Sequence, residues 1–258
     1  MNKENKPILV SAGGAVARIT LNRPDAYNAL SAELIAALHA QLNEIASNSA
    51  IRVVVIAAQG RAFSAGHDLK DIADIPAEAS AYAALFKQCS ALMLRIQSLP
   101  QPVIAQVQGI ATAAGCQLVA ACDLAVAGES ARFATSGINL GLFCATPSVP
   151  LMRNMPRKHA MRMLLTGDFI SAQAAAQWGL INECVADEAL SATVDALAAK
   201  LCAQAPQALA LGKQLVYQQA NLGEAAAYTL AGQVMARNMA LECAQTGMAG
   251  FVNKTKTN

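Results

Sequence analysis

The sequence predicts an α/β domain followed by a helical extension. Over about the first two-thirds of the 258 residues, short apolar strand-like runs alternate with helical segments. From Arg157 onward nearly every segment has helical character. Three of the strand-like runs end in loops of small residues, and such loops after buried strands are where ligands usually dock in α/β sheets.

The first elements follow from hydrophobic patterning and turn chemistry. Residues 8–21 predict two strands joined by a turn at Gly13 and Gly14. Ser31 is placed to cap a helix. The apolar positions of that helix fall on one face and are Leu34, Ile35, Leu38, Leu42 and Ile45.

Continuous apolar runs predict strands that are buried on both faces. They lie at Val53–Ile56, Val103–Val107 and Leu124–Val126. A long helical segment covers residues 78–97 and ends before Leu99 and Pro100. A short helix is expected just after Gly115.

Loops of small residues follow the three buried strands, at residues 59–66, 108–115 and 127–131. Small residues let the main chain turn sharply and approach a ligand closely. The second loop enters a helix, whose first N–H groups are unpaired. Two such loops can aim one N–H each at a single oxygen, which would form an oxyanion hole. Close packing of helix against sheet explains the same pattern, so both interpretations stay open here.

Composition bounds the possible partners. The formal net charge is only +2 and no basic run is present, which argues against a polynucleotide ligand. The most apolar stretch, residues 104–128, is interrupted by Gln106, Gln117 and Asp123 and is no membrane span. Charged residues make up 14% of the chain and apolar residues 55%, which favours a homo-oligomer that hides part of this surface. Alanine-rich helices with few charges are the alternative explanation.

The seven cysteines form no C-x-x-C pair, and the chain has three histidines, so no zinc-binding spacing can be drawn. We therefore expect no metal. Residues 1–7 are polar and lead directly into a strand, which predicts the absence of a secretory signal. Together these features predict a reduced, cytoplasmic protein.

Several sequence motifs occur in the same order as in one known family. They are Leu21–Leu30, Phe63–Lys70, Pro102–Ala105, Gly109–Asp123, Leu164–Gly167, Ala175–Leu180 and Gly250–Lys254. Over essentially its whole length the sequence resembles the crotonase (enoyl-CoA hydratase/isomerase) superfamily. It looks most like a subgroup with Ala-Gly-His-Asp-Leu in the first loop and Cys-Gln in the second, the enoyl-CoA hydratase domain-containing proteins.

The resemblance implies a crotonase-like (ClpP/crotonase) spiral of ββα units with a C-terminal helical region. Residues 1–190 would form the spiral core, and residues 191–258 a helical region for trimerisation and for covering coenzyme A. Trimers that often pair as hexamers are expected. The ligand would be an acyl-CoA thioester, with coenzyme A as part of the substrate and no other cofactor.

The resemblance also assigns site residues by position. The main-chain N–H groups of His67 and Ala114 would be the oxyanion donors. Lys70 would lie near the phosphates of coenzyme A, and Phe251 and Lys254 would reach the coenzyme A of a neighbouring subunit. The remaining residues expected to contact substrate or coenzyme A are Ala26, Ala65, Gly66, Asp68, Leu69, Gly115, Gly137 and Cys144.

Three positions depart from the family pattern. Asp25 stands where many members have lysine. The two glutamates with which family hydratases handle water fall at Gln117 and Gly137. An amide cannot accept a proton at useful pH, and glycine has no side chain. Since a positioned acid or base contributes about 10²–10⁴ in rate, hydration by the usual route should be weak.

Individual side chains have competing interpretations. The His67 ring could shuttle protons, or it could pack aside while only its N–H matters. Asp68 is expected to cap the next helical turn. Cys116 and Cys144 could be reactive or could only fill space. Gln117 is expected to contact the reacting end of the substrate by hydrogen bonding.

These observations predict an acyl-CoA-processing enzyme, nominally an enoyl-CoA hydratase (a lyase of fatty acid metabolism), with weak or altered activity. Double-bond isomerisation and decarboxylation need the same enolate and are alternatives. A non-catalytic acyl-CoA-binding protein is a third possibility. A serine peptidase of similar fold is disfavoured, because Ser64 does not stand at a helix N-terminus with a nearby histidine and aspartate.

Overall fold

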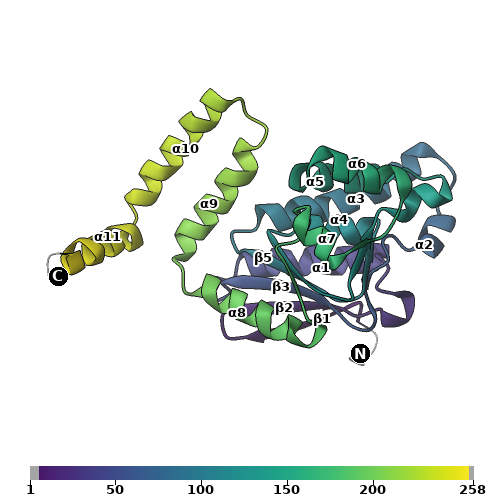
Figure 1. The fold of residues 1–258 in the computed structure, drawn as a ribbon, viewed down its shortest axis with the longest axis horizontal. Coiled ribbons are helices and arrows are strands. Elements are labelled where there is room, and N and C mark those ends of the chain that lie inside the picture. Colours follow the sequence, from purple (N-terminus) through teal and green to yellow (C-terminus); the bar gives the residue numbers. More distant parts are fainter. Residues whose placement is uncertain (1–5, 256–258) are drawn as a thin grey trace.

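Two sheets lie at the centre of the protein in the computed structural model, which describes residues 6–255 (Figure 1). The larger sheet has the strand order β1-β2-β3-β5-β7-β10 and the smaller one the order β4-β6-β8-β9. Only β1–β2 and β8–β9 pair antiparallel. The strands are β1 (Ile8–Gly13), β2 (Val16–Leu21), β3 (Val53–Ala58), β4 (Ala62–Ser64), β5 (Val103–Val107), β6 (Ile110–Thr112), β7 (Leu124–Gly128), β8 (Arg132–Ala134), β9 (Ile170–Ser171) and β10 (Glu183–Val185).

Helices surround the sheets and continue to the end of the described chain. They are α1 (Ala32–Ala46), α2 (Leu69–Ala73), α3 (Ala79–Ser98), α4 (Ala114–Ala121), α5 (Ala145–Asn154), α6 (Arg157–Thr166), α7 (Ala172–Gln177), α8 (Leu190–Cys202), α9 (Pro206–Gln219), α10 (Glu224–Met239) and α11 (Glu242–Thr255). Short 3₁₀ turns are η2 (Pro24–Ala26), η3 (Ser136–Leu140) and η4 (Asp187–Ala189). Among residues 6–255, no helix is long and apolar enough to cross a bilayer.

Helix α1 confirms the prediction made from its pattern. The Ser31 hydroxyl accepts a hydrogen bond from the Leu34 N–H, and the five apolar positions expected on one face are the buried ones. The predicted strands β3, β5 and β7 are also present. Val53, Val55 and Val126 face α8 on one side of the larger sheet, while neighbouring strand residues join the main core on the other.

The small-residue segments are only partly loops, which corrects the sequence prediction. Segments 59–66 and 108–115 contain β4 and β6, and segment 127–131 contains the end of β7 and the turn that leads to β8. Each unit therefore runs from a strand of the larger sheet to a short strand of the smaller sheet and on to a helix. Three residues are too few to show alternating burial, so the pattern could not reveal these strands.

The last three helices project from the body (Figure 1). Helix α8 still packs on the sheet, whereas α9 buries no residue fully and α10 buries only Val234. The expected division into residues 1–190 and 191–258 stays a prediction. The projecting arm itself starts after α8 (Figure 1).

A buried ion pair attaches α9 to the body. Lys213 Nζ lies 2.6 Å from the Asp123 carboxylate and donates to the main-chain oxygens of Ile96 and Gln101. The Tyr217 hydroxyl donates to the other Asp123 oxygen at 2.9 Å. Burial raises the pKa of Asp123 and lowers the pKa of Lys213, so each group depends on its partner to stay charged.

Lys213→Met will destabilise the protein, because it leaves the Asp123 carboxylate buried without a cation. Removing one partner of such a pair typically costs about 3–5 kcal/mol. The measurement is urea unfolding at a fixed protein concentration. Lys200→Met, on the exposed face of α8, is the matched control and should change stability by less than about 0.5 kcal/mol. Equal effects of the two changes would contradict this account.

Candidate active site

The first loop holds the N–H of His67 in a defined direction. Leu30 and His67 form a parallel bridge, in which the Leu30 N–H donates to Gly66 O at 2.7 Å and the Asp68 N–H donates to Leu30 O at 3.2 Å. In a parallel bridge the central residue's own N–H points away from its partner. The N–H of His67 therefore faces away from Leu30.

The second loop presents the N–H of Ala114 at the start of α4. Ala113 precedes the helix with φ 49° and ψ −119°, a conformation that residues with a side chain rarely adopt. Its N–H donates to Ala134 O on the neighbouring strand at 3.0 Å. Ala114 is the first helical residue, so its N–H has no intrahelical acceptor. Strain of this kind clusters at functional sites.

Two glycines bring the loops into contact. Gly66 has φ +94°, and a Cβ built on it would lie 3.2 Å from the Ala114 nitrogen. A Cβ on Gly115 would lie only 2.2 Å from the Ser64 oxygen. Any side chain at either position would push the loops apart. Gly66, the residue before His67, therefore lies against the main chain at Ala114.

Buried polar side chains fix this arrangement. Asn28 is fully buried with φ 52°, and its side-chain N–H₂ donates to the main-chain oxygens of Gln59 and Ala62, both at 2.8 Å. The Ser64 hydroxyl donates to Asn28 O at 2.9 Å. Ser64 is completely buried, which argues against a serine nucleophile. The sequence analysis assigned no role to Asn28. An asparagine in a predicted turn often hydrogen-bonds to nearby main-chain groups, and this tendency could have indicated its structural role.

Two side chains of these segments, His67 and Gln117, carry buried polar atoms without partners. Within the described residues, both ring nitrogens of His67 and Oε1 of Gln117 are buried with no hydrogen-bond partner. Burial lowers the pKa of His67, partly opposed by the Leu30 main chain, so its ring is neutral at pH 7. Gln117 is 3% exposed and lies one turn after Ala114 on α4. Buried unpaired groups are costly and mark a place where a ligand can supply partners.

Gly137 and Cys144 adjoin the second loop. The hydroxyl groups of Thr112 and Ser136 are 2.8 Å apart, which ties the end of β6 to the start of η3. A Cβ on Gly137 would lie 2.9 Å from Cys144 Sγ. Burial raises the pKa of Cys144, partly opposed by the Gly137 main chain. It raises the pKa of Cys116 to about 12, with a smaller contribution from Cys144.

The residues predicted to lie along coenzyme A are partly brought together. The Ala65 N–H donates to Tyr27 O at 3.0 Å, which sets the first loop beside Ala26 in η2. Asp68 caps α2 by accepting from the Lys70 N–H, as predicted, and pairs with Arg23 at 2.9 Å. Burial alone would raise the pKa of Asp68, but hydrogen bonds from Arg23 and Lys70 outweigh it and lower this pKa.

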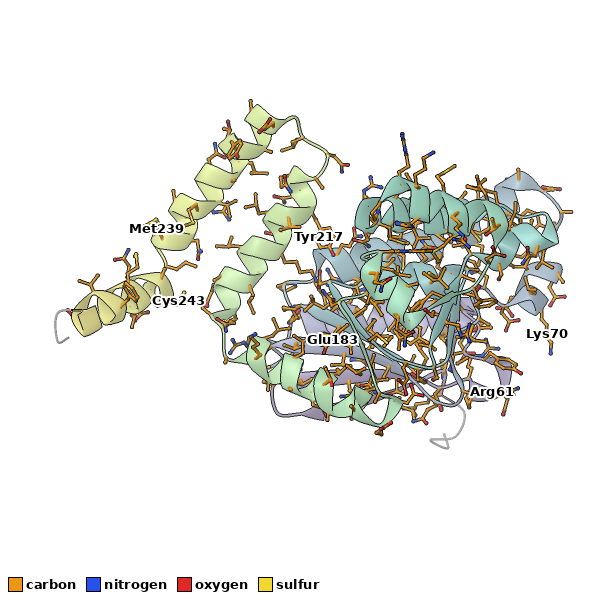
Figure 2. The ribbon with its side chains drawn as sticks, viewed as in Figure 1. Arg61, Lys70, Glu183, Tyr217, Met239 and Cys243 are labelled. Atoms are coloured by element: carbon orange, nitrogen blue, oxygen red, sulfur yellow. The ribbon has the colours of Figure 1, made fainter. Side chains whose placement is uncertain are left out.

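Lys70 lies at the edge of the body, far from the C-terminal arm (Figure 2), and both Lys70 and the preceding Leu69 are exposed. Phe251 is 71% exposed on α11, at the opposite end of the molecule (Figure 1). The side chain of Lys254 lies outside the described residues. In a single chain the arm does not reach the loops, so the expected contacts of Phe251 and Lys254 stay predictions. Across residues 6–255, no three His, Cys, Asp or Glu side chains group as metal ligands do.

Comparison with known proteins identifies the family. The profile of the enoyl-CoA hydratase/isomerase family matches residues 11–258. This chain belongs to that family. It is 45% identical over 253 residues to the enoyl-CoA hydratase domain-containing protein 3, mitochondrial, of Danio rerio, covering 96% of this chain and 86% of the relative.

Solved structures agree with this assignment. A crystal structure described as an enoyl-CoA hydratase of Mycobacterium smegmatis superposes with a TM-score of 0.94 at 49% identity, covering 96% of each chain. The crystal structure of the human enoyl-CoA hydratase domain-containing protein 3 superposes with a TM-score of 0.92 at 40% identity. The match covers 96% of this chain and 98% of the human one. These similarities confirm the predicted superfamily, its subgroup and the crotonase fold.

The comparison with sequence relatives shows that the predicted cytoplasmic location is wrong. Five relatives at 40–45% identity are all named mitochondrial. The prediction rested on free cysteines and a polar first segment. Unpaired thiols indicate a reducing environment and do not identify the compartment.

Gly115→Ala will weaken binding of acyl-CoA esters, because the new Cβ would collide with the Ser64 main chain and move the Ala114 N–H. If the Ala114 N–H is one of two oxyanion donors, as we propose below, its loss should cost about 10²–10³ in rate. We expect at least about tenfold weaker binding of acetoacetyl-CoA, measured by calorimetry. Gly223→Ala is the control, since a Cβ there meets nothing within 4 Å. Unchanged affinity in a folded Gly115→Ala variant would refute the geometry.

Proposed function

We propose that this protein is an acyl-CoA enzyme that stabilises a thioester enolate between the main-chain N–H groups of His67 and Ala114. Support comes from the close approach of Gly66, on which a Cβ would lie 3.2 Å from the Ala114 nitrogen, and from the direction of the His67 N–H away from Leu30. Both donors are main-chain groups at fixed positions, and fixed dipoles aimed at developing charge are a large term in catalysis. No cofactor beyond the coenzyme A of the substrate is part of this proposal.

We further propose that hydration of 2-enoyl thioesters is slow. The side chain of Gln117 can hold a water or an acyl oxygen, but it cannot remove a proton. Gly137 has no side chain, and a Cβ there would lie 2.7 Å from the Leu142 oxygen and 2.9 Å from Cys144 Sγ. A glutamate at residue 137 would therefore require the main chain to move. The neutral His67 imidazole, with its lowered pKa, is a weak substitute.

Gln117→Glu will raise the rate of crotonyl-CoA hydration, since it supplies a general base on the first turn of α4. One positioned base contributes about 10²–10⁴ in rate, and without the second carboxylate we expect the lower end of that range. Loss of the enoyl absorbance is the measurement. Gln173→Glu, exposed on α7, is the control and should leave the slow rate unchanged.

Wild-type turnover comparable with that of ordinary family hydratases would contradict the proposed role of Gln117. Binding of crotonyl-CoA without turnover by either variant would favour a non-catalytic acyl-CoA-binding protein.

We also propose that the chain forms a homo-oligomer, a trimer or a pair of trimers, through its projecting arm. Apolar side chains on the arm are exposed in the single chain, including Val216, Leu222, Tyr228, Met235, Met239 and Met248. Exposed apolar patches of this kind mark protein interfaces. Figure 2 places Met239 near the junction of α10 and α11, away from the body.

Met235→Glu will dissociate the oligomer, because it buries a charge in an apolar contact. Sedimentation velocity measures the state directly. Met235→Leu conserves volume and apolar character, so it should leave the oligomer intact. A wild-type chain that sediments as a monomer would refute the proposal.

A further inference from the structure

The imidazole ring of His67 is buried without a hydrogen bond. Both of its nitrogens are buried, and neither has a hydrogen-bond partner among residues 6–255. The ring packs edge-on against Phe86 of α3, with the ring centroids 5.6 Å apart and the planes at 79°. A phenyl ring offers no ordinary hydrogen-bond donor or acceptor. Native proteins rarely leave buried polar atoms unpaired, so this ring calls for an explanation beyond packing.

The protonation state of the ring decides what kind of partner it needs. Burial lowers the pKa of His67, so at pH 7 the ring is neutral and carries one N–H and one bare nitrogen. The Leu30 main chain partly opposes this shift, because its carbonyl favours a proton on the nearer ring nitrogen, although the two do not reach hydrogen-bond geometry. The other nitrogen is then an acceptor, and only a group with its own hydrogen can satisfy it.

Gln117 supplies a second acceptor without a donor. Its side chain is almost completely buried, and within the described chain its Oε1 has no hydrogen-bond partner. It lies one turn after Ala114 on α4, and α4 packs against α3, the helix that carries Phe86. If the N–H groups of His67 and Ala114 hold one thioester oxygen, the His67 ring and the Gln117 side chain border the same acyl chain.

We propose that the protein takes thioesters whose acyl chain carries a hydroxyl group beyond C3, and that the ring of His67 is the residue that selects them. This inference rests on the proposed function, which fixes the thioester oxygen at the His67 N–H. The ring belongs to the same residue, so it lies within one side-chain length of that oxygen. The proposed chemistry acts on C2 and C3, so a hydroxyl bound by an unreacting ring stands farther along the chain.

The need for a donor distinguishes a hydroxyl from other polar acyl groups. A keto oxygen and a carboxylate only accept hydrogen bonds, so neither can pair with a bare ring nitrogen or with Gln117 Oε1. A buried carboxylate also needs a positive partner, whereas the His67 ring is neutral. A plain alkyl chain leaves both acceptors unpaired. A hydroxyl donates its hydrogen to the ring nitrogen and satisfies it.

Matched pairs of saturated thioesters test this selection, because hydration cannot consume them. The probes are 4-hydroxybutyryl-CoA against butyryl-CoA and 6-hydroxyhexanoyl-CoA against hexanoyl-CoA, with affinities for the full chain measured by calorimetry. We expect the hydroxylated member of at least one pair to bind about tenfold more tightly to the wild type, the contribution of about one hydrogen bond to a buried acceptor.

Substitutions of the ring separate its nitrogens from its shape. His67→Phe keeps the main-chain N–H and a flat ring but has no ring nitrogen, so it should abolish the difference within the pair. His67→Gln retains an acceptor and should restore part of it. His159→Phe is the matched control, since the His159 ring stacks on Trp178 at 4.2 Å, and it should keep the wild-type ratio.

Nitrogen-15 NMR of the wild type tests the ring without any substitution. Hydrogen bonding to the bare nitrogen of His67 should shift its resonance when the hydroxylated ester binds and leave it in place when the alkyl ester binds. A ring with a purely structural role would respond equally to both esters, and that result would contradict the proposal.

Equal affinities within both pairs, or an unchanged ratio in a folded His67→Phe variant, overturn this inference and leave the two main-chain donors standing. Tighter binding of succinyl-CoA than of 4-hydroxybutyryl-CoA overturns the assignment of a hydroxyl group. Failure of the wild type to bind any of these thioesters overturns the proposed function as well.

Discussion

The close approach of Gly115 to the main chain of Ser64 is the constraint on which the site depends. A methyl group at residue 115 would lie 2.2 Å from the Ser64 oxygen, so the first turn of α4 can rest on the end of β4 only because this residue has no side chain. All eight residues of α4 are buried, which fixes the helix from every side. The positive φ of Ala113 is the strained joint that this packing enforces.

Much of the body was predictable because local patterns and tertiary packing agree. The five apolar residues of α1 recur at helical spacing behind a serine cap, and the residues predicted to be buried are buried. Strands β4, β6 and β8 escaped prediction because three residues show no periodicity; their pairing is set by partners that are distant in sequence. Likewise, the sequence around Lys213 does not indicate that its side chain will pair with Asp123, which lies 90 residues earlier in the chain.

The site was less accessible from residue types, because its proposed donors are main-chain groups. The pattern of small residues is compatible both with an oxyanion hole and with close packing of helix against sheet. Only the resemblance to the family favours the oxyanion hole. The structure adds the direction of the His67 N–H and the supports from Asn28 and Ser64, which depend on contacts across the loops. The cap formed by Asp68 could be foreseen, since it bonds two residues ahead.

Main-chain donors and side-chain acids can change independently in a site of the proposed kind. The positions of the His67 and Ala114 N–H groups are set by glycine contacts in the core, so a substitution at residue 117 or 137 leaves them in place. Each donor and each positioned acid or base contributes on a similar scale, roughly 10²–10⁴ in rate. In the proposed site the main-chain donors would therefore stay in place, while the neutral amide at residue 117 cannot remove a proton.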